Sequence, residues 1–180
     1  AQGMWGLQAL IRTCGYICER APGIPMILDA KRADIGNTNI GYVKSMEIYG
    51  VDAITVHPYL GREALQPFLD QKDKDIFVLC RTSNPGAGEF QDLEMSTAMT
   101  SSGTIKLYEY VAHKVTRIWD TNNNCGLVVG ATYPEELKTI RGIAGDMPIL
   151  IPGIGAQGGD VEATVKAGKD SRGRGMIINS

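Results

Sequence analysis

Two oppositely charged side chains stand close together in the run DAKRAD at residues 29–34, directly after the apolar stretch 26–28. On a strand, residues two apart point to the same side, so Asp29 and Lys31 would project together, roughly 6.6 Å apart along the backbone. Catalytic groups of α/β proteins lie at the carboxyl ends of strands, where a lysine can donate a proton. The alternative is a structural ion pair, because a buried charge must be paired.

A glycine-rich segment, PGIGAQGGD at residues 152–160, contains the spacing G-x-G-x-x-G. A dinucleotide site is disfavoured because the segment follows a late strand, and no acidic residue ends a strand about 20 positions further on. Backbone N–H groups in such a turn, placed before a helix, can bind phosphate. We therefore expect a phosphate cradle, with a plain tight turn as the alternative.

A polar segment, RTSNPGAG at residues 81–88, follows another apolar run. Its hydroxyl and amide groups could bind the polar edges of a base or sugar, although a surface turn has the same composition. Residues 89–103 are long for a connecting loop, which favours a mobile lid. His57 follows a strand without a partnered nucleophile and is more typical of packing than of catalysis, and His113 is expected to be structural.

The elements that must position these residues alternate between strand and helix. Strands are predicted at 26–31, 52–57, 75–80, 126–130, 148–151 and 175–179, and helices at 3–20, from 37 or 38 to before Gly50, and at 61–70, 104–119, from 132, and 158–168. Continuous apolar strands are typical of a parallel sheet that is covered on both faces. A doubly wound sheet and a (β/α)₈ barrel both fit this pattern.

Composition narrows the classes of protein. The chain has 180 residues and a net charge of −2, and we expect one domain over 1–180. We expect no binding of nucleic acid, since neutralising the phosphate backbone of a nucleic acid needs clustered Lys and Arg. No apolar run reaches the roughly 18 residues of a membrane span, and no signal peptide is recognisable. The four cysteines are expected to be buried and reduced in a cytoplasmic protein. The start without Met predicts a piece of a longer protein.

Five segments together resemble one enzyme family. They are LDAKRADIGNT (28–38), VHPYLGREALQPF (56–68), VLCRTSNPGAGEFQDL (78–93), GLVVGATYPEEL (126–137) and PGIGAQGGD (152–160). The sequence is similar to the orotidine 5′-phosphate decarboxylases, in their longer bacterial subfamily. The resemblance implies a (β/α)₈ barrel of which strands 3 to 8 are present. It also implies that orotidine 5′-monophosphate loses CO₂ to give uridine 5′-monophosphate, without a metal or organic cofactor.

The resemblance further implies roles for the charged run and the residues after it. Asp29 would face the departing carboxylate, and Lys31 would protonate C6 of the pyrimidine. Asp34 would complete the active site of the other subunit of a homodimer, with Ile35 and Thr38 beside it.

Substrate contacts are implied for the later segments. Ser83 would form a hydrogen bond with the pyrimidine, and Pro152 would line the pyrimidine pocket. Gln157 and the backbone amide of Gly158 would hold the phosphate.

The chain also departs from the family pattern. An aspartate that binds the ribose, a second lysine of the charged array and an arginine that binds the phosphate have no counterpart in the sequence, so the chain alone is expected to be incomplete. Three alternatives remain: a related phosphosugar decarboxylase that uses Mg²⁺, a non-catalytic nucleotide-binding barrel, and one domain of a bifunctional synthase with a phosphoribosyltransferase.

Overall fold

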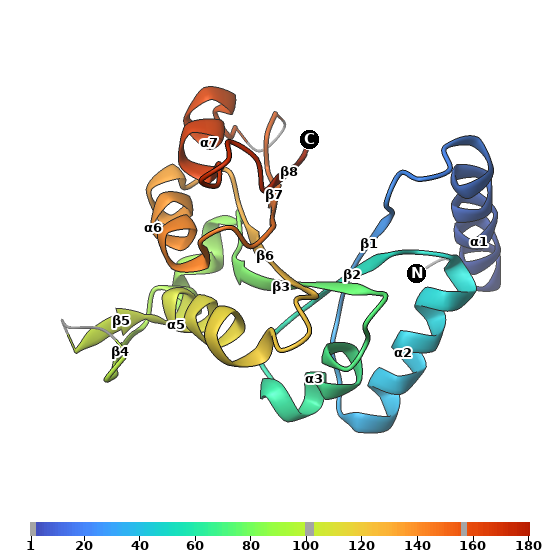
Figure 1. Ribbon diagram of the computed structural model, residues 1–180, viewed down its shortest axis with the longest axis horizontal. Coiled ribbons are helices and arrows are strands. Elements are labelled where there is room, and N and C mark those ends of the chain that lie inside the picture. Colours follow the sequence, from blue (N-terminus) through green and yellow to red (C-terminus); the bar gives the residue numbers. More distant parts are fainter. Residues whose placement is uncertain (1–2, 100–102, 156–157) are drawn as a thin grey trace.

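Six parallel strands form one curled sheet in the computed structural model, which describes residues 3–99, 103–155 and 158–180 (Figure 1). The strands are β1 (Ile27–Arg32), β2 (Ala53–Val56), β3 (Asp75–Arg81), β6 (Cys125–Val129), β7 (Ile149–Pro152) and β8 (Met176–Asn179). They lie side by side in chain order, β1-β2-β3-β6-β7-β8, without a reversal. A doubly wound sheet reverses its order, so the structure is the barrel alternative, with the sheet covering part of the barrel wall.

The helices lie on the convex side of this sheet (Figure 1). They are α1 (Gly3–Arg20), α2 (Gly36–Tyr49), α3 (Gly61–Leu69), α5 (Leu107–Lys114) with the π-helix η2 (Val115–Trp119), α6 (Pro134–Ala144) and α7 (Val161–Gly168). Because each crossover between parallel strands is right-handed and the order never reverses, every connecting helix falls on the same face. The predicted alternation of strands and helices is confirmed.

The two faces of the sheet have different cores. On β3, Ile76 and Val78 are fully buried against the helices and belong to a large cluster that includes Met46 and Phe68. Phe77 points to the other face, inside the curl, where a small cluster contains it with Ala53, Val128 and Leu150. Strand side chains alternate between faces, so a strand that is covered on both reads as one continuous apolar run.

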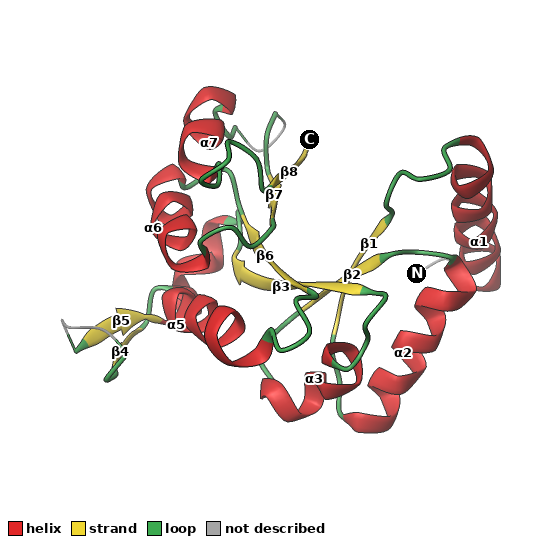
Figure 2. Cartoon of the chain, viewed as in Figure 1, coloured by secondary structure: helices red, strands yellow, loops and turns green. Residues whose placement is uncertain are grey.

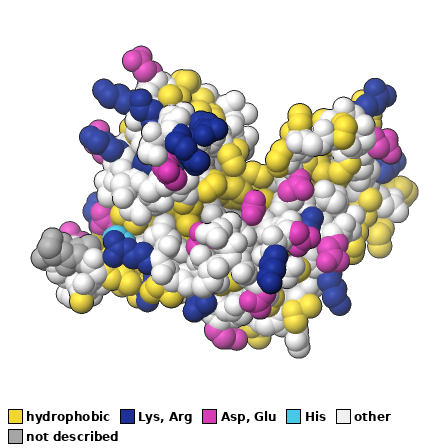
Figure 3. All heavy atoms as spheres, viewed as in Figure 1, with side chains coloured by type: hydrophobic (Ala, Val, Ile, Leu, Met, Phe, Trp, Pro, Cys, Tyr) yellow, Lys and Arg dark blue, Asp and Glu magenta, His cyan; other side chains and the backbone are white. Residues whose placement is uncertain are grey.

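The first and last strands of the sheet, β1 and β8, are its two edges. Apolar side chains near these edges are exposed, including Trp5 on α1 at 79% and Ile178 on β8 at 42%. Figure 3 shows hydrophobic side chains gathered in the hollow between these two sides of the molecule. The concave face of the sheet is therefore open to solvent along this hollow.

The connection between β3 and α5 differs from the sequence prediction. It folds as a 3₁₀ turn η1 (Pro85–Ala87), a short helix α4 (Gly88–Gln91) and an antiparallel hairpin of β4 (Glu94–Ser96) with β5 (Thr104–Lys106), which projects from the body (Figure 2). The helix predicted from 104 begins at Leu107, because the Glu109 carboxylate accepts the Lys106 N–H at 2.7 Å and caps the helix there.

The four cysteines are free, and three of them, Cys14, Cys80 and Cys125, are buried. Burial raises the pKa of the Cys80 and Cys125 thiols well above the usual range. The prediction that all four are buried is wrong for Cys18, whose exposed Sγ lies 3.8 Å from the Gly50 carbonyl. Within the described ranges, no helix is both long and apolar enough to cross a membrane.

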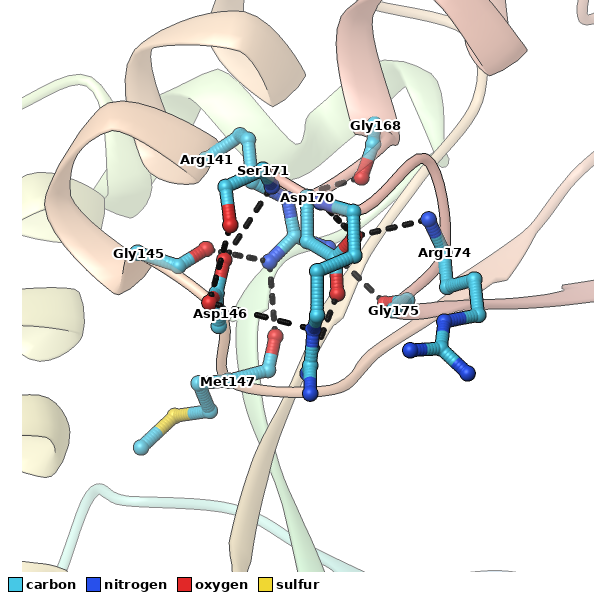
Figure 4. Close-up of polar contacts among 10 residues, drawn as sticks. Arg141, Gly145, Asp146, Met147, Gly168, Asp170, Ser171, Arg174 and Gly175 are labelled. Carbon is cyan, nitrogen blue, oxygen red and sulfur yellow. Dashed lines mark hydrogen bonds and ion pairs between the residues drawn. The ribbon is translucent and has the colours of Figure 1, made fainter.

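A buried guanidinium joins four elements at the amino-terminal edge of the sheet (Figure 4). Arg141 of α6 is 8% exposed, and its nitrogens donate hydrogen bonds of 2.7–2.8 Å to four backbone carbonyls. The acceptors are Gly145, Met147, Gly168 and Gly175. These residues end α6 and α7 and precede β7 and β8, so one side chain fixes where both strands begin.

We expect Arg141→Leu to lower the free energy of unfolding by about 3 kcal/mol, because buried carbonyls would lose their donors. Denaturant unfolding of the full-length protein measures this effect. Arg12→Leu on the exposed face of α1 is the matched control and should change the stability by less than about 0.5 kcal/mol. Equal stability of the two variants would contradict the role of Arg141.

Candidate active site

Polar residues gather where the parallel strands end, at the edge opposite the Arg141 contacts. Asp29 and Lys31 lie on β1, Thr55 lies on β2, and Ser83 is the second residue after β3. The glycine-rich segment 153–160 follows β7. Since parallel strands end at the same edge, the sheet brings together segments that are far apart in the sequence.

The charged pair on β1 is formed as the alternating pattern predicts. Lys31 Nζ lies 2.7 Å from both carboxylate oxygens of Asp29. The side chains are 52% and 43% exposed, respectively, so a ligand in the open concave face can reach both. The pair thus presents an ammonium and a carboxylate side by side.

Thr55, which the sequence did not single out, contacts both members of the pair. Its hydroxyl donates to Asp29 Oδ1 at 2.8 Å and accepts the backbone N–H of Lys31 at 2.9 Å. Thr55 is fully buried. The signal for this residue is a hydroxyl among the apolar side chains of the strand AITV, because a buried polar group needs a partner.

The backbone of Lys31 adopts an uncommon conformation. Its φ is +47°, in the left-handed region, and the pairing of β1 with β2 shifts register between Leu28 and Arg32. This conformation costs about 1–2 kcal/mol for a residue with a side chain, whereas an exposed ion pair contributes about 0–1 kcal/mol. Stability alone therefore does not account for the geometry, and strain of this kind is typical of functional sites.

The loop that carries Asp34 is held by hydrogen bonds with the buried Asn39. Buried Asn39 accepts the Asp34 N–H at 2.8 Å, and its amide donates to the carbonyls of Asp34 and Ala64. The Asp34 carboxylate accepts the N–H of Ile35 at 2.7 Å. Ile35, which is 67% exposed, and Thr38 both lie at the surface, beside the start of α2.

The segment after β3 is held against the end of β6 by a close approach. A Cβ on Gly130 would lie 2.7 Å from Ser83 Cβ, so only glycine leaves room for Ser83. Gln91 of α4 braces the preceding residue, accepting from Thr82 N at 2.9 Å and donating to Thr82 Oγ1 at 2.8 Å. The sequence had not marked Gln91 or Gly130, because neither contact is local.

A buried arginine supports the same segment from inside. Arg81, at the end of β3, is 2% exposed and lies over the rings of Tyr133 at 4.5 Å and Tyr108 at 5.6 Å. Its Nη2 is 3.3 Å from the Asp92 carboxylate. Burial raises the pKa of Tyr108 to about 12, so this phenol stays protonated and neutral near pH 7. Arg81 thus supports the segment rather than presenting its charge to solvent.

The glycine-rich segment uses two of its backbone donors internally. Gly158 N donates to Gly155 O at 2.8 Å, and Gly159 N donates to Gly153 O at 3.0 Å. Gly158 is exposed, with a φ of +83°. Gln157 lies outside the described residues. The turn is thus closed by its own backbone, and Gly158 is at its surface.

Pro152 and Asp160 mark the two ends of this turn. Pro152 is the last residue of β7, and its carbonyl accepts from Ala131 N at 2.8 Å. Asp160 caps α7 by accepting from Ala163 N at 2.6 Å. The helix therefore begins at Val161 instead of 158, because a carboxylate cap fixes its start, and that carboxylate already satisfies one terminal N–H.

A cavity of about 850 Å³ lies beside this edge, between α3, β3 and α5. Its lining includes His57, Tyr59, Phe90, Tyr108 and Trp119, but none of the residues predicted for the site. Across residues 3–99, 103–155 and 158–180, no three His, Cys, Asp or Glu side chains are grouped so that they could hold a metal ion. None of the described residues predicted for the site therefore lines this cavity.

Both the sequence and the fold of this chain resemble those of known proteins. Residues 11–179 match the family described as orotidine 5′-phosphate decarboxylase / HUMPS. The orotidine 5′-phosphate decarboxylase of Janthinobacterium sp. (strain Marseille) is 51% identical over 168 residues, which are 93% of this chain. The chain spans 59% of the length of that relative.

Solved structures agree with the sequence match. The structure of Leishmania donovani UMP synthase superposes with a TM-score of 0.90 at 42% identity and covers 99% of this chain and 38% of that one. Leishmania donovani OMP decarboxylase gives a TM-score of 0.88 at 40% identity, covering 99% of this chain and 66% of that one. From its fold, the match over residues 11–179 and these identities, the chain belongs to the orotidine 5′-phosphate decarboxylase / HUMPS family.

Proposed function

We propose that the full-length protein decarboxylates orotidine 5′-monophosphate to uridine 5′-monophosphate. The observation that carries this proposal is the contact of Lys31 Nζ with both carboxylate oxygens of Asp29, at 2.7 Å, in the open concave face. Membership of the family and 51% identity to a relative named for this activity support it. We place the reaction in the cytoplasm, where the four free thiols would stay reduced.

Lys31 is the proposed proton donor. When the bond between C6 and the carboxyl group breaks, CO₂ leaves and the electron pair stays on C6 of the pyrimidine. An ammonium held at a fixed position stabilises this developing charge, and it then transfers a proton to C6. The contacts of Lys31 Nζ with both carboxylate oxygens of Asp29 would hold the ammonium in place before the substrate binds.

Asp29 is proposed to face the substrate carboxylate. Two negative groups at close range disfavour the bound substrate, and the repulsion ends when CO₂ departs. Binding of the remote phosphate would offset this cost. The same carboxylate also holds Lys31 Nζ, so Asp29 would direct the proton donor as well.

The remaining contacts are assigned from the loops at the same edge. Ser83, held against Gly130, is proposed to bind the pyrimidine, and Pro152 to line its pocket. Gln157 and Gly158 are proposed to hold the phosphate, at the exposed position of Gly158 in a glycine-rich turn. Because the Gly158 N–H donates to Gly155 O, the phosphate would replace or share this hydrogen bond.

The active unit is proposed to be a homodimer with shared active sites. Asn39 holds the loop that carries Asp34, and Ile35 and Thr38 are exposed next to it. A loop held at the surface in this way can contribute a side chain to a site on a symmetry-related subunit.

The first test is turnover of orotidine 5′-monophosphate by the full-length protein, measured with and without EDTA. We expect turnover that EDTA does not change. Loss of activity with EDTA would favour a phosphosugar-type enzyme that uses Mg²⁺, and nucleotide binding without turnover would favour a non-catalytic barrel.

Lys31→Ala should lower kcat by at least about 10³-fold without unfolding the protein, because it removes both the charge and the proton. Lys31→Arg should also be inactive, since a guanidinium keeps its proton near pH 7. Lys138→Ala, an exposed lysine on α6, is the control and should keep full activity. A Lys31→Ala variant with half the normal rate would contradict the proton-donor role.

Gln157→Ala should raise KM for the phosphorylated substrate by about tenfold, the loss expected for one charge-assisted hydrogen bond. Turnover of the nucleoside orotidine should change much less, because it carries no phosphate. Equal losses in kcat/KM for the two substrates would count against this assignment.

Mixing two inactive variants tests the shared site. Lys31→Ala subunits and Asp34→Ala subunits are combined in equal amounts and allowed to exchange. If Asp34 acts across the dimer, half of the dimers are mixed and each has one intact site, so about one quarter of the wild-type rate should return. If Asp34 serves its own chain, every site keeps a defect, and a mixture that stays inactive after proven exchange rejects the shared site.

A further inference from the structure

We propose that Thr55 is a positioning residue that holds Asp29 and Lys31 in their reactive arrangement. The inference rests on the proposed decarboxylase function and adds a specific role for one buried hydroxyl. It arises from two contacts, 2.8 Å to Asp29 Oδ1 and 2.9 Å to Lys31 N, which join the side chain of one partner to the backbone of the other.

The hydroxyl of Thr55 has one proton, so the direction of one of its two hydrogen bonds determines the direction of the other. It accepts from the Lys31 N–H, which can only donate, and its own proton is therefore directed at Asp29 Oδ1. This arrangement requires Asp29 Oδ1 to act as an acceptor. Asp29 Oδ1 also accepts from Lys31 Nζ, so the three groups form a closed ring of hydrogen bonds.

The register of the sheet explains why a side chain is needed here. Leu28 pairs with Ile54 and Arg32 pairs with Val56, so three residues of β1 lie opposite Thr55 alone. A strand with extra residues bulges, and the backbone groups in the bulge lose their partners in the ladder. The Thr55 hydroxyl replaces the missing acceptor for the N–H of Lys31, the residue whose φ is +47°.

Burial makes Thr55 the rigid member of the group. It is 0% exposed between the apolar neighbours Ile54 and Val56, whereas the side chains of Asp29 and Lys31 are 43% and 52% exposed. Exposed charged side chains lose entropy when they are held in one geometry, and surface ion pairs are weak for this reason. A fixed hydroxyl beneath them restricts their positions before the substrate binds.

A purely structural role predicts a different pattern of effects. If Thr55 only fills the core, replacing it should lower stability and leave the kinetics of the folded fraction unchanged. If it positions the pair, the chemical step should slow even in fully folded protein, since small displacements of catalytic groups lower rates by up to about 10²-fold. Binding of the nucleotide product should change little, because neither the base nor the phosphate contacts are altered.

The test compares Thr55→Val with Thr55→Ser in the full-length protein. Thr55→Val keeps the shape of the side chain but removes the hydroxyl, and we expect kcat to fall by about 10- to 100-fold while KM stays within about threefold. Thr55→Ser keeps the hydroxyl and should retain kcat within about threefold. Thr116→Val, which removes a hydroxyl that contacts Ala112 O on α5, is the matched control and should leave kcat unchanged.

Two results would overturn the proposal: a Thr55→Val variant with kcat within twofold of wild type, or a Thr55→Ser variant as slow as Thr55→Val. If Thr55→Val does not fold, Thr55→Cys gives the same comparison, because a thiol forms only weak hydrogen bonds.

A wild-type protein that does not turn over orotidine 5′-monophosphate would reject the proposed function instead. In that case, crystal structures of the wild type and Thr55→Val decide the positioning role. A variant that keeps the 2.7 Å contacts between Lys31 Nζ and Asp29 rejects it, and a variant that loses them supports it.

Discussion

The parallel pairing of β1 with β2 is the constraint on which the candidate site depends. Asp29 and Lys31 both lie on β1, Lys31 Nζ contacts both carboxylate oxygens of Asp29, and the pairing of β1 with β2 shifts register opposite Thr55. The same pairing places Thr55 beneath them. The other segments of the site follow strands that end at the same edge of the sheet as the contact between Asp29 and Lys31.

The sequence predicted this contact for an incomplete reason. Two charges two residues apart do face the same side, yet Lys31 adopts a left-handed conformation that no local pattern indicates. The helices and strands were predictable because their apolar residues repeat with the periods of helix and buried strand. The choice of a barrel over a doubly wound sheet rested on resemblance, and the unreversed strand order now supplies its physical basis.

Contacts between distant residues were not predictable from local patterns. Thr55 lies 26 positions from Asp29, and the room that Gly130 leaves for Ser83 involves residues 47 positions apart. The hairpin of β4 and β5 was missed for another reason, since its strands have only three residues each, too few for their polar–apolar–polar pattern to indicate a strand. The start of α5 at Leu107, after the hairpin, depends on one carboxylate, that of Glu109, which accepts a hydrogen bond from the Lys106 N–H.

The contacts of Arg141 have a consequence for how this chain can change over evolutionary time. Four main-chain oxygens receive its protons, and three of them belong to glycines. Gly145 and Gly175 have positive φ, and a Cβ on Gly168 would lie 2.9 Å from Ile151 Cδ1, so these positions constrain residue identity as the arginine does. Strand placement at one end of the half-barrel is thus encoded by the arginine together with the glycines around it. Loops at the other end are free to diversify and to acquire new substrate preferences without disturbing that framework.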